Sequence, residues 1–96
     1  LTSKQRSYLS GLAAAVNPTV MVGKDGASEG VVQALAAEFK HRELIKVRFV
    51  ASKDEKAEFA EVLARNCGAE LVRIIGNVAV LYRRADKAED RAIVLP

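Results

Sequence analysis

The order of the predicted elements places this chain of 96 residues in the α/β class, with the arrangement αβαβαββ. Apolar residues recur at helical spacing in three segments, and short β-branched or alternating runs follow each of them. A two-residue turn signal joins the last two runs. We therefore expect a two-layer sandwich with a small mixed four-stranded sheet, built as one domain because two independent cores do not fit in this length.

Residues 3–15 are predicted to form the first helix. Thr2 and Gln5 fit a capping box, in which each side chain satisfies a backbone N–H group of the first turn. Asn17-Pro18 ends the helix, because proline disfavours helical backbone in the residue before it. The run 19–22 then predicts a buried strand that stops at Gly23. The apolar positions expected to face the core from this helix are Tyr8, Leu9, Leu12, Ala13 and Val16.

The second helix is expected to start near Ser28 and to run to about Lys40. The segment 43–49 alternates as a strand should. Its core face carries Ile45, Val47 and Phe49, and its other face carries Leu44, Lys46 and Arg48. One face of this strand is therefore expected to be largely basic.

Ser52-Lys53-Asp54-Glu55 predicts a second capping box at the start of the third helix, and Gly68 is expected to end that helix in a left-handed conformation. Segments 70–75 and 78–82 are predicted to form an antiparallel hairpin around Gly76-Asn77. Two crossover connections before the hairpin predict that neighbouring strands are parallel, with the helices mainly on one side.

The chain after the hairpin reads as an appendage. We expect a single domain over 1–84 and a charged C-terminal tail over 85–96. Residues 93–95 are apolar and leave two alternatives, an added edge strand or a loose end.

The charge balance is modest and uneven. Lys and Arg number 15 and Asp and Glu number 12, and the whole excess of +3 lies in residues 1–48. This is compatible with nucleic-acid binding, but small basic enzymes share it. No apolar run reaches the roughly 20 residues of a membrane-spanning helix, and no signal-like segment opens the chain. We expect a cytoplasmic protein that has no membrane partner.

Catalytic chemistry finds little support in the sequence. His41 lies in a basic stretch and reads as solvated or structural, and the lone Cys67 reads as a semi-buried structural thiol. It has no second Cys for a disulfide or a zinc site. The carboxylates Asp54, Glu55, Glu58 and Glu61 read as the exposed face of a helix. We therefore expect no catalytic residues, no metal and no cofactor.

The loop Gly23-Lys24-Asp25-Gly26 has two possible roles. It lies between a strand and a helix, where backbone N–H groups attract phosphate, glycines permit close approach and Lys24 adds positive charge. It lacks the spacing of a P-loop. The alternative is a plain strand-to-helix turn, and Asp25 would repel an anion unless it points away.

Basic side chains outside the loop have two possible interpretations. They form either an ordinary solvated surface or a surface that binds the phosphates along an RNA chain. Little aromatic interleaving accompanies them, so base stacking of the RRM type is not supported. The basic candidates are Lys4, Arg6, Arg42, Lys46, Arg48 and Arg83.

Several ordered motifs together resemble one known family. They are Leu1-Thr2 with Lys4-Gln5-Arg6, Asn17-Pro18 with 22–26, Glu29-Gly30-Val31, the run 43–49, and Ile75-Gly76-Asn77 leading to 80–83. Over about residues 1–84 the chain resembles the YhbY-like, or CRM, RNA-binding domain. One departure is that Ala27-Ser28 stands where the family usually has Leu-Thr, so a packing side chain is lost while Ser28 keeps a capping oxygen.

The resemblance implies a fold similar to the C-terminal domain of bacterial translation initiation factor three. It also implies that the Gly-x-x-Gly loop, here Gly23 to Gly26, contacts RNA together with the basic strand residues Lys46 and Arg48. Bacterial members of the family associate with precursors of the large ribosomal subunit and are thought to assist its assembly.

Three classes of function follow. The first is a monomeric, non-enzymatic protein that binds ribosomal RNA and particles that precede the large subunit. The second is an adaptor that meets ribosomal proteins through the acidic helix 53–66. The third is a small phosphate-handling enzyme, and the Arg and Asn pattern of an acylphosphatase loop is not found here.

Overall fold

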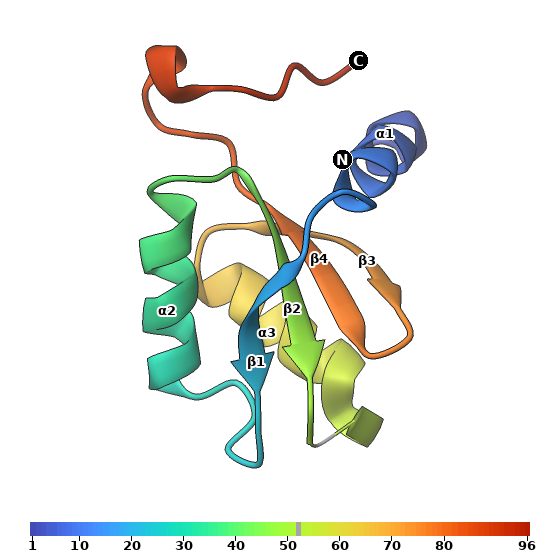
Figure 1. Cartoon of the computed structure of the whole chain (residues 1–96), viewed down its shortest axis with the longest axis vertical. Coiled ribbons are helices and arrows are strands. Elements are labelled where there is room, and N and C mark those ends of the chain that lie inside the picture. Colours follow the sequence, from blue (N-terminus) through green and yellow to red (C-terminus); the bar gives the residue numbers. More distant parts are fainter. Residues whose placement is uncertain (52) are drawn as a thin grey trace.

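A computed structural model describes residues 1–51 and 53–96 and has the predicted α/β architecture (Figure 1). The elements follow one another in the predicted order. The helices are α1 (Ser3–Ala13), α2 (Glu29–Phe39) and α3 (Lys56–Asn66). The strands are β1 (Pro18–Val22), β2 (Leu44–Phe49), β3 (Glu70–Ile75) and β4 (Val78–Tyr82). Short 3-10 turns occupy Lys53–Glu55 and Ala88–Asp90.

The capping residues predicted for the first two helices are confirmed. The Gln5 backbone N–H donates to Thr2 Oγ1 at 3.1 Å, and the Thr2 N–H donates to Gln5 Oε1 at 3.0 Å. Ser28 caps α2 by accepting a hydrogen bond from the Val31 N–H. These side chains satisfy N–H groups that the first helical turn leaves without an intrahelical partner, so the local sequence sets where both helices begin.

The third helix begins differently from the expectation. A 3-10 turn over Lys53–Glu55 leads into α3, and the N-cap residue Glu55 makes no side-chain capping bond. The predicted cap at Ser52 lies outside the described residues. The other end agrees with the prediction, because Gly68 follows the helix with a left-handed φ of 65°.

The strand order of the sheet is β1-β2-β4-β3. β1 and β2 are parallel neighbours and β3 and β4 form the predicted hairpin. The expectation that each crossover joins neighbouring strands is wrong for β2 and β3, because β4 lies between them and pairs antiparallel with both. The hairpin thus folds β4 back onto β2, and β1 and β3 become the two edge strands.

Each face of the sheet carries its own core. α2 and α3 cover one face, where Val22, Leu35, Val47, Leu63 and other apolar residues pack together. α1 packs on the opposite face, over one end of the sheet (Figure 1). Its contacts there are made through Leu9 and Ala13. They cover Leu44, Val72, Val80 and Tyr82.

Two positions that were expected to face the core from α1 are instead solvent-exposed. Tyr8 is 42% exposed and Leu12 is 38% exposed. The helix lies over only one end of a small sheet, so its buried stripe is narrower than the apolar spacing suggested.

Residues 85–96 lie along the end of the sheet rather than extending away from it (Figure 1). Ile93 and Leu95 pack against the α1 core without forming a strand, so this segment is neither the added edge strand nor the loose end that the sequence left as alternatives. The Glu43 carboxylate anchors this segment by accepting hydrogen bonds from the N–H groups of Ala85, Ala92 and Ile93 at 2.7–2.9 Å.

The same hydrogen bonds lower the pKa of the Glu43 carboxyl group. Burial by itself raises the pKa of the Glu43 carboxyl, but the three backbone donors and the nearby Arg91 charge outweigh it and hold the pKa below its ordinary value. Among the described residues, no helix has the length and apolarity needed to cross a membrane.

Candidate functional site

The Gly-x-x-Gly loop joins the end of β1 to the start of α2. The Gly26 N–H donates to the Gly23 carbonyl oxygen at 3.1 Å and so closes a tight turn over Lys24 and Asp25. Both of these charged side chains are exposed. The Ser28 N–H then donates to the Gly26 carbonyl at 2.8 Å and leads into the helix. The loop presents a lysine and an aspartate at the N-terminal end of α2, where the helix dipole favours anions.

The two glycines of the loop differ in what the fold requires of them. Gly26 has φ of 62°, and a Cβ atom placed there would lie 2.6 Å from the Phe59 ring of α3. Gly23 has no heavy atom within 4 Å of a Cβ position, and its φ lies outside the left-handed region. Packing and backbone geometry thus demand glycine at 26 but not at 23. A glycine that the fold does not need is what a closely approaching ligand backbone would favour.

Lys46 and Arg48 point away from the α2–α3 core, as the alternation of the segment 43–49 predicted. Their neighbours Ile45, Val47 and Phe49 lie in the core against α2 and α3. Lys46 is half-buried and Arg48 is exposed on the opposite face. The strand phase is therefore confirmed.

The structure brings Arg48 and the loop to the same end of the sheet. Arg48 pairs with Met21 of the parallel neighbour β1, and Met21 precedes Gly23 by two residues. The loop lies at the lower end of the ribbon, while α1 covers the upper end of this face (Figure 1). We call the uncovered part, formed by Met21, Lys46, Arg48, Arg73, Ile75 and Val78, the open sheet face.

Arg73 is a basic residue that the sequence argument missed. It pairs with Val80 in the sheet, and Val80 pairs with Lys46 on its other side, so the two cations flank one strand on the open sheet face. A register shift between Leu71 and Arg73 sets this orientation. Simple alternation cannot reveal such a bulge, because one extra residue reverses the phase of the strand.

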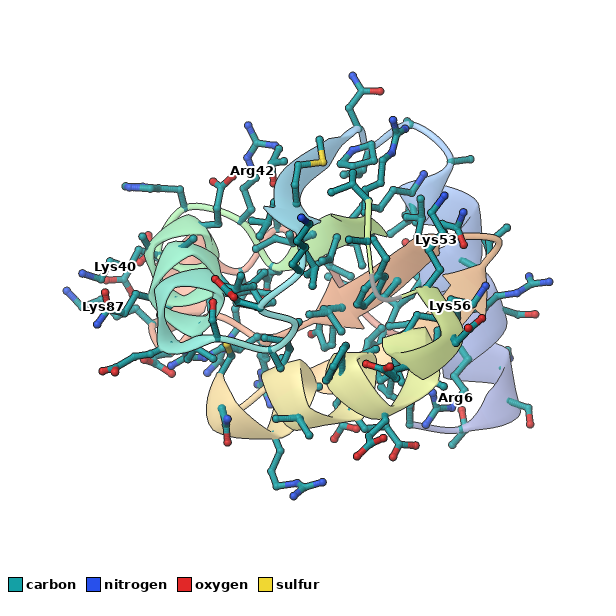
Figure 2. All side chains as sticks on the ribbon, turned by 90° about the horizontal axis from the view of Figure 1, so that it is seen from below. Arg6, Lys40, Arg42, Lys53, Lys56 and Lys87 are labelled. Atoms are coloured by element: carbon teal, nitrogen blue, oxygen red, sulfur yellow. The ribbon has the colours of Figure 1, made fainter. Side chains whose placement is uncertain are left out.

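Lys56 supports the same end of the sheet from α3. Its Nζ donates to the Gly76 carbonyl at 2.6 Å and to Asn77 Oδ1 at 3.4 Å, which ties the hairpin turn to the helix. Figure 2, seen from the loop end, shows Lys56 and Lys53 beside the start of α3 and shows Lys40 and Lys87 at the outer side of α2.

The remaining basic candidates lie away from the loop. Arg42 precedes β2 and Arg83 follows β4, so both lie at the other end of the sheet, and Lys4 is exposed on α1. Arg83 forms an ion pair with Asp86 at 3.7 Å. The Arg6 guanidinium donates to the carbonyl oxygens of Leu71 and, at 3.1 Å, of Val72, so this side chain ties α1 to β3.

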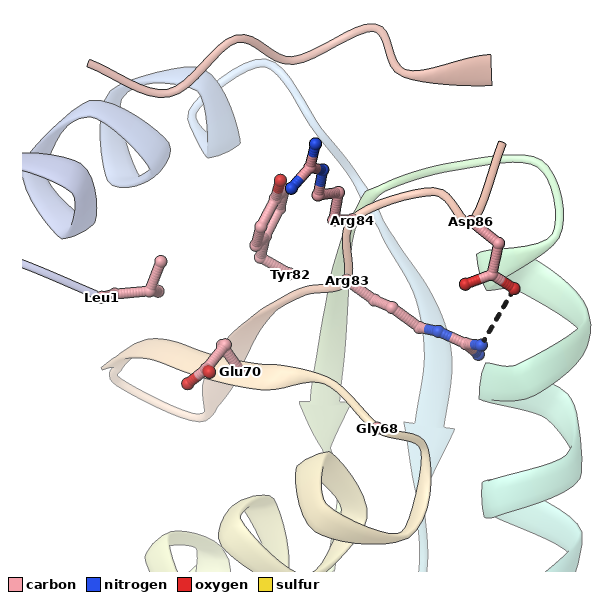
Figure 3. A pocket seen from close by; sticks show the side chains of 7 residues that line it. All are labelled: Leu1, Gly68, Glu70, Tyr82, Arg83, Arg84 and Asp86. Carbon is pink, nitrogen blue, oxygen red and sulfur yellow. Dashed lines mark ion pairs between the residues drawn. The ribbon is translucent and has the colours of Figure 1, made fainter. Parts of the chain in front are cut away.

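A shallow pocket of about 430 Å³ opens at that other end of the sheet (Figure 3). It is lined by Leu1, Gly68, Glu70, Tyr82, Arg83, Arg84 and Asp86. Burial is the main cause that raises the pKa of the Tyr82 hydroxyl above its ordinary value. The pocket therefore offers charged and neutral hydrogen-bonding groups, and it is separate from the loop.

The residues considered for catalysis occupy ordinary structural positions. Cys67 is buried, burial raises the pKa of its thiol, and its Sγ donates to the Val32 carbonyl at 3.7 Å. His41 is exposed. Within residues 1–51 and 53–96, no three His, Cys, Asp or Glu side chains gather as metal ligands. The acidic side chains of α3, including Glu58 and Glu61, are exposed in the helical layer behind the sheet.

Comparisons with known proteins agree on one family. The profile of the CRS1/YhbY (CRM) domain matches residues 1–83. A Haemophilus influenzae protein named as an RNA-binding protein is 38% identical over 90 residues, which cover 93% of this chain and 91% of the relative. A Bacillus subtilis protein, YqeI, named as a probable RNA-binding protein, is 35% identical and is covered over 99% of its length.

A solved structure confirms the fold. The solution structure of a Staphylococcus aureus protein, described as a hypothetical protein thought to bind RNA, superposes with a TM-score of 0.86 at 37% identity. It covers 100% of this chain and 99% of its own. The family profile, the relatives and the shared fold together show that this chain belongs to the CRS1/YhbY (CRM) domain family.

Proposed function

We propose that this protein is a non-enzymatic RNA-binding module that associates with ribosomal RNA in the cytoplasm and assists assembly of the large ribosomal subunit. It contacts RNA phosphates through the loop Gly23–Gly26 and through Lys46 and Arg48. One observation carries the proposal: the exposed loop and the exposed Arg48 lie at the same uncovered end of the sheet.

The chemistry of this end suits a phosphate chain. Gly23 leaves room for a ligand backbone to approach, and α2 begins immediately beyond the loop with its positive dipole end. Lys24, Lys46, Arg48 and Arg73 add positive charge. The relatives are named for RNA binding, which supports RNA as the partner and a role in binding rather than in catalysis.

A salt titration tests the binding mode. Fluorescence anisotropy with fragments of large-subunit ribosomal RNA should give an affinity that falls steeply between low and moderate salt, because each neutralised phosphate releases counterions. An affinity that stays constant over this range contradicts a phosphate-based interface.

The ribosomal role has its own test. A tagged protein should sediment with particles that precede the large subunit in a sucrose gradient, and a Lys46→Gln/Arg48→Gln variant should leave those fractions. Sedimentation of the parent protein only at the top of the gradient contradicts the role in assembly while leaving RNA binding intact.

An adaptor role is the second candidate, because α3 and the turn before it expose Asp54, Glu55, Glu58 and Glu61 on the layer opposite the open sheet face. Such a surface would attract basic ribosomal proteins. Glu58→Gln/Glu61→Gln should leave association with precursor particles unchanged if RNA binding carries it, and should abolish it if the adaptor role does.

A further inference from the structure

Four side chains form one row across the open sheet face. Met21 of β1 pairs with Arg48 of β2, Arg48 pairs with Val78 of β4, and Val78 pairs with Ile75 of β3. Directly paired residues point to the same face of a sheet, so these side chains stand side by side. We call Met21, Arg48, Val78 and Ile75 the aliphatic row.

Large apolar side chains in this row remain exposed to solvent, although α1 packs on the same face of the sheet at its other end. Met21 and Ile75 are each 50% exposed, and Val78 is partly exposed. At the other end of the same face, α1 buries Val80 completely and leaves Tyr82 only 5% exposed. Single exposed apolar residues are ordinary on protein surfaces. Here three of them lie in one row, with Met21 on one side of Arg48 and Val78 and Ile75 on the other, and such a group is typical of an interaction surface.

The positive charges on the open sheet face indicate what kind of partner can bind there. Lys46 and Arg73 form the next row along the strands, on either side of Val80, and neither row contains an acidic residue. The loop with Lys24 follows two residues after Met21. The partner must therefore combine flat apolar surfaces with closely spaced negative charges.

Unpaired nucleotides of RNA have this combination. Their bases expose apolar faces that pack on aliphatic side chains and stack on arginine guanidinium planes, and their phosphates are anionic. In an RNA duplex the base faces are stacked on one another and only the phosphates and groove edges remain available. A methionine thioether is also favourable beside an aromatic ring.

We propose that the aliphatic row is a platform for unpaired bases, which makes single-stranded segments of RNA the preferred ligand of this chain. The inference rests on the proposed function and goes beyond it, because phosphate contacts alone would not separate single strands from duplexes. The loop and the cations Lys46, Arg48 and Arg73 hold the sugar-phosphate chain. Met21 and Ile75 hold the bases, and the Arg48 guanidinium lies between them.

The test compares two RNA probes made from the same labelled strand, one left single and one annealed to its complement. The row is altered by Met21→Gln with Ile75→Thr, which keeps the length of the first side chain and the β-branch of the second. Val94→Ala, at a position that is 81% exposed in the C-terminal segment, is the matched control for loss of an exposed apolar group. Thermal unfolding of all three proteins confirms that they fold.

The parent protein should bind the single strand about tenfold more tightly than the duplex. The row variant should lose most of this preference, with duplex affinity and the salt slope unchanged, since no phosphate contact is removed. The control should behave as the parent.

Four outcomes overturn the inference. Equal affinity of the parent for both probes, or an unchanged preference in the row variant, removes the platform but leaves the proposed function standing. A parent protein that binds neither probe removes both. Concentration-dependent dimerisation that the row variant abolishes would assign the row to self-association instead.

Discussion

The ring of Phe59 lies where a Cβ atom on Gly26 would have to go, with Cζ only 2.6 Å from that position. This contact joins the Gly-x-x-Gly loop to α3, although Gly26 and Phe59 are more than thirty residues apart in the chain. The second glycine of the loop is therefore a packing residue, and its partner ring holds the loop against the helical layer. The first glycine has no such neighbour.

Gly26→Ala is expected to destabilise the fold. The left-handed backbone costs about 1–2 kcal/mol for a residue with a Cβ atom, and crowding against Phe59 adds about 1–3 kcal/mol. A loss of about 2 kcal/mol already lowers Tm by roughly 10 °C in a domain of this size. Thermal unfolding measures the effect.

Gly23→Ala is the matched control and should leave Tm within a few degrees while weakening RNA binding. Equal Tm losses in the two variants would contradict the different roles that the structure gives these glycines. A smaller penalty for Gly26→Ala in a Phe59→Ala background would confirm that the ring is part of the cost.

Lys46→Gln/Arg48→Gln should weaken RNA binding through loss of charge, with Tm changed by only a few degrees. Neither side chain contributes to the core against α2 and α3. If each contacts one phosphate of a single strand, the slope of log K against log salt should fall by about 1.4.

The control removes two positive charges elsewhere, through Arg65→Gln in α3 and Lys87→Gln in the C-terminal segment. It should change the affinity for RNA far less. Equal losses in both double variants would mean that net charge, rather than the open sheet face, governs binding.

Lys24→Asp should separate binding from folding. Lys24 is exposed and precedes α2, and negative charge near a helix N-terminus is favoured by about 0.3–1 kcal/mol. Stability should therefore change little, whereas affinity for RNA should fall by about tenfold, equivalent to about 1.4 kcal/mol. A stable variant that binds RNA as tightly as the parent would mean that the loop is only a strand-to-helix turn and does not contact RNA.

Acid should release the C-terminal segment. In the folded protein the pKa of Glu43 lies below its ordinary value of 4.5, so its hydrogen bonds stabilise the fold above that pH and lose this effect as pH falls through the lowered pKa. The protection factors of the Ala85, Ala92 and Ile93 amides, which correct for the slower intrinsic exchange in acid, should fall below about pH 4.5.

Glu43→Gln should accelerate the same exchange at neutral pH. Its carbonyl can still accept from Ala92 and Ile93, but its amide group faces the Ala85 N–H, an arrangement that costs about 1–3 kcal/mol. Glu89→Gln removes an exposed carboxylate from the same segment by the same chemical change and is the control. Unchanged exchange in Glu43→Gln would contradict the anchoring role.

Local sequence signals predicted most of the fold. The capping pairs of α1 and α2, the alternation of β2 and the hairpin over 70–82 are encoded by residues close together in the chain. The insertion of β4 between β2 and β3 was not predicted, because strand order depends on long-range pairing that no single segment specifies.

The candidate site was predicted only in part, for the same reason. The loop and the orientation of Lys46 and Arg48 follow from local patterns. Arg73 was missed because a bulge reorients it. Outside the site, the anchoring role of Glu43 was missed because its partners lie some forty residues later in the chain. The packing of Phe59 on Gly26 also required the folded arrangement.

The loop Gly23–Gly26 and the open sheet face are expected to contact RNA together. Titration of ¹⁵N-labelled protein with a single-stranded fragment of large-subunit ribosomal RNA tests it directly by NMR. The largest backbone shift changes should occur at 21–26 and 46–48, with small changes along α3. Changes concentrated on the exposed acidic face of α3, with the loop unaffected, would contradict it.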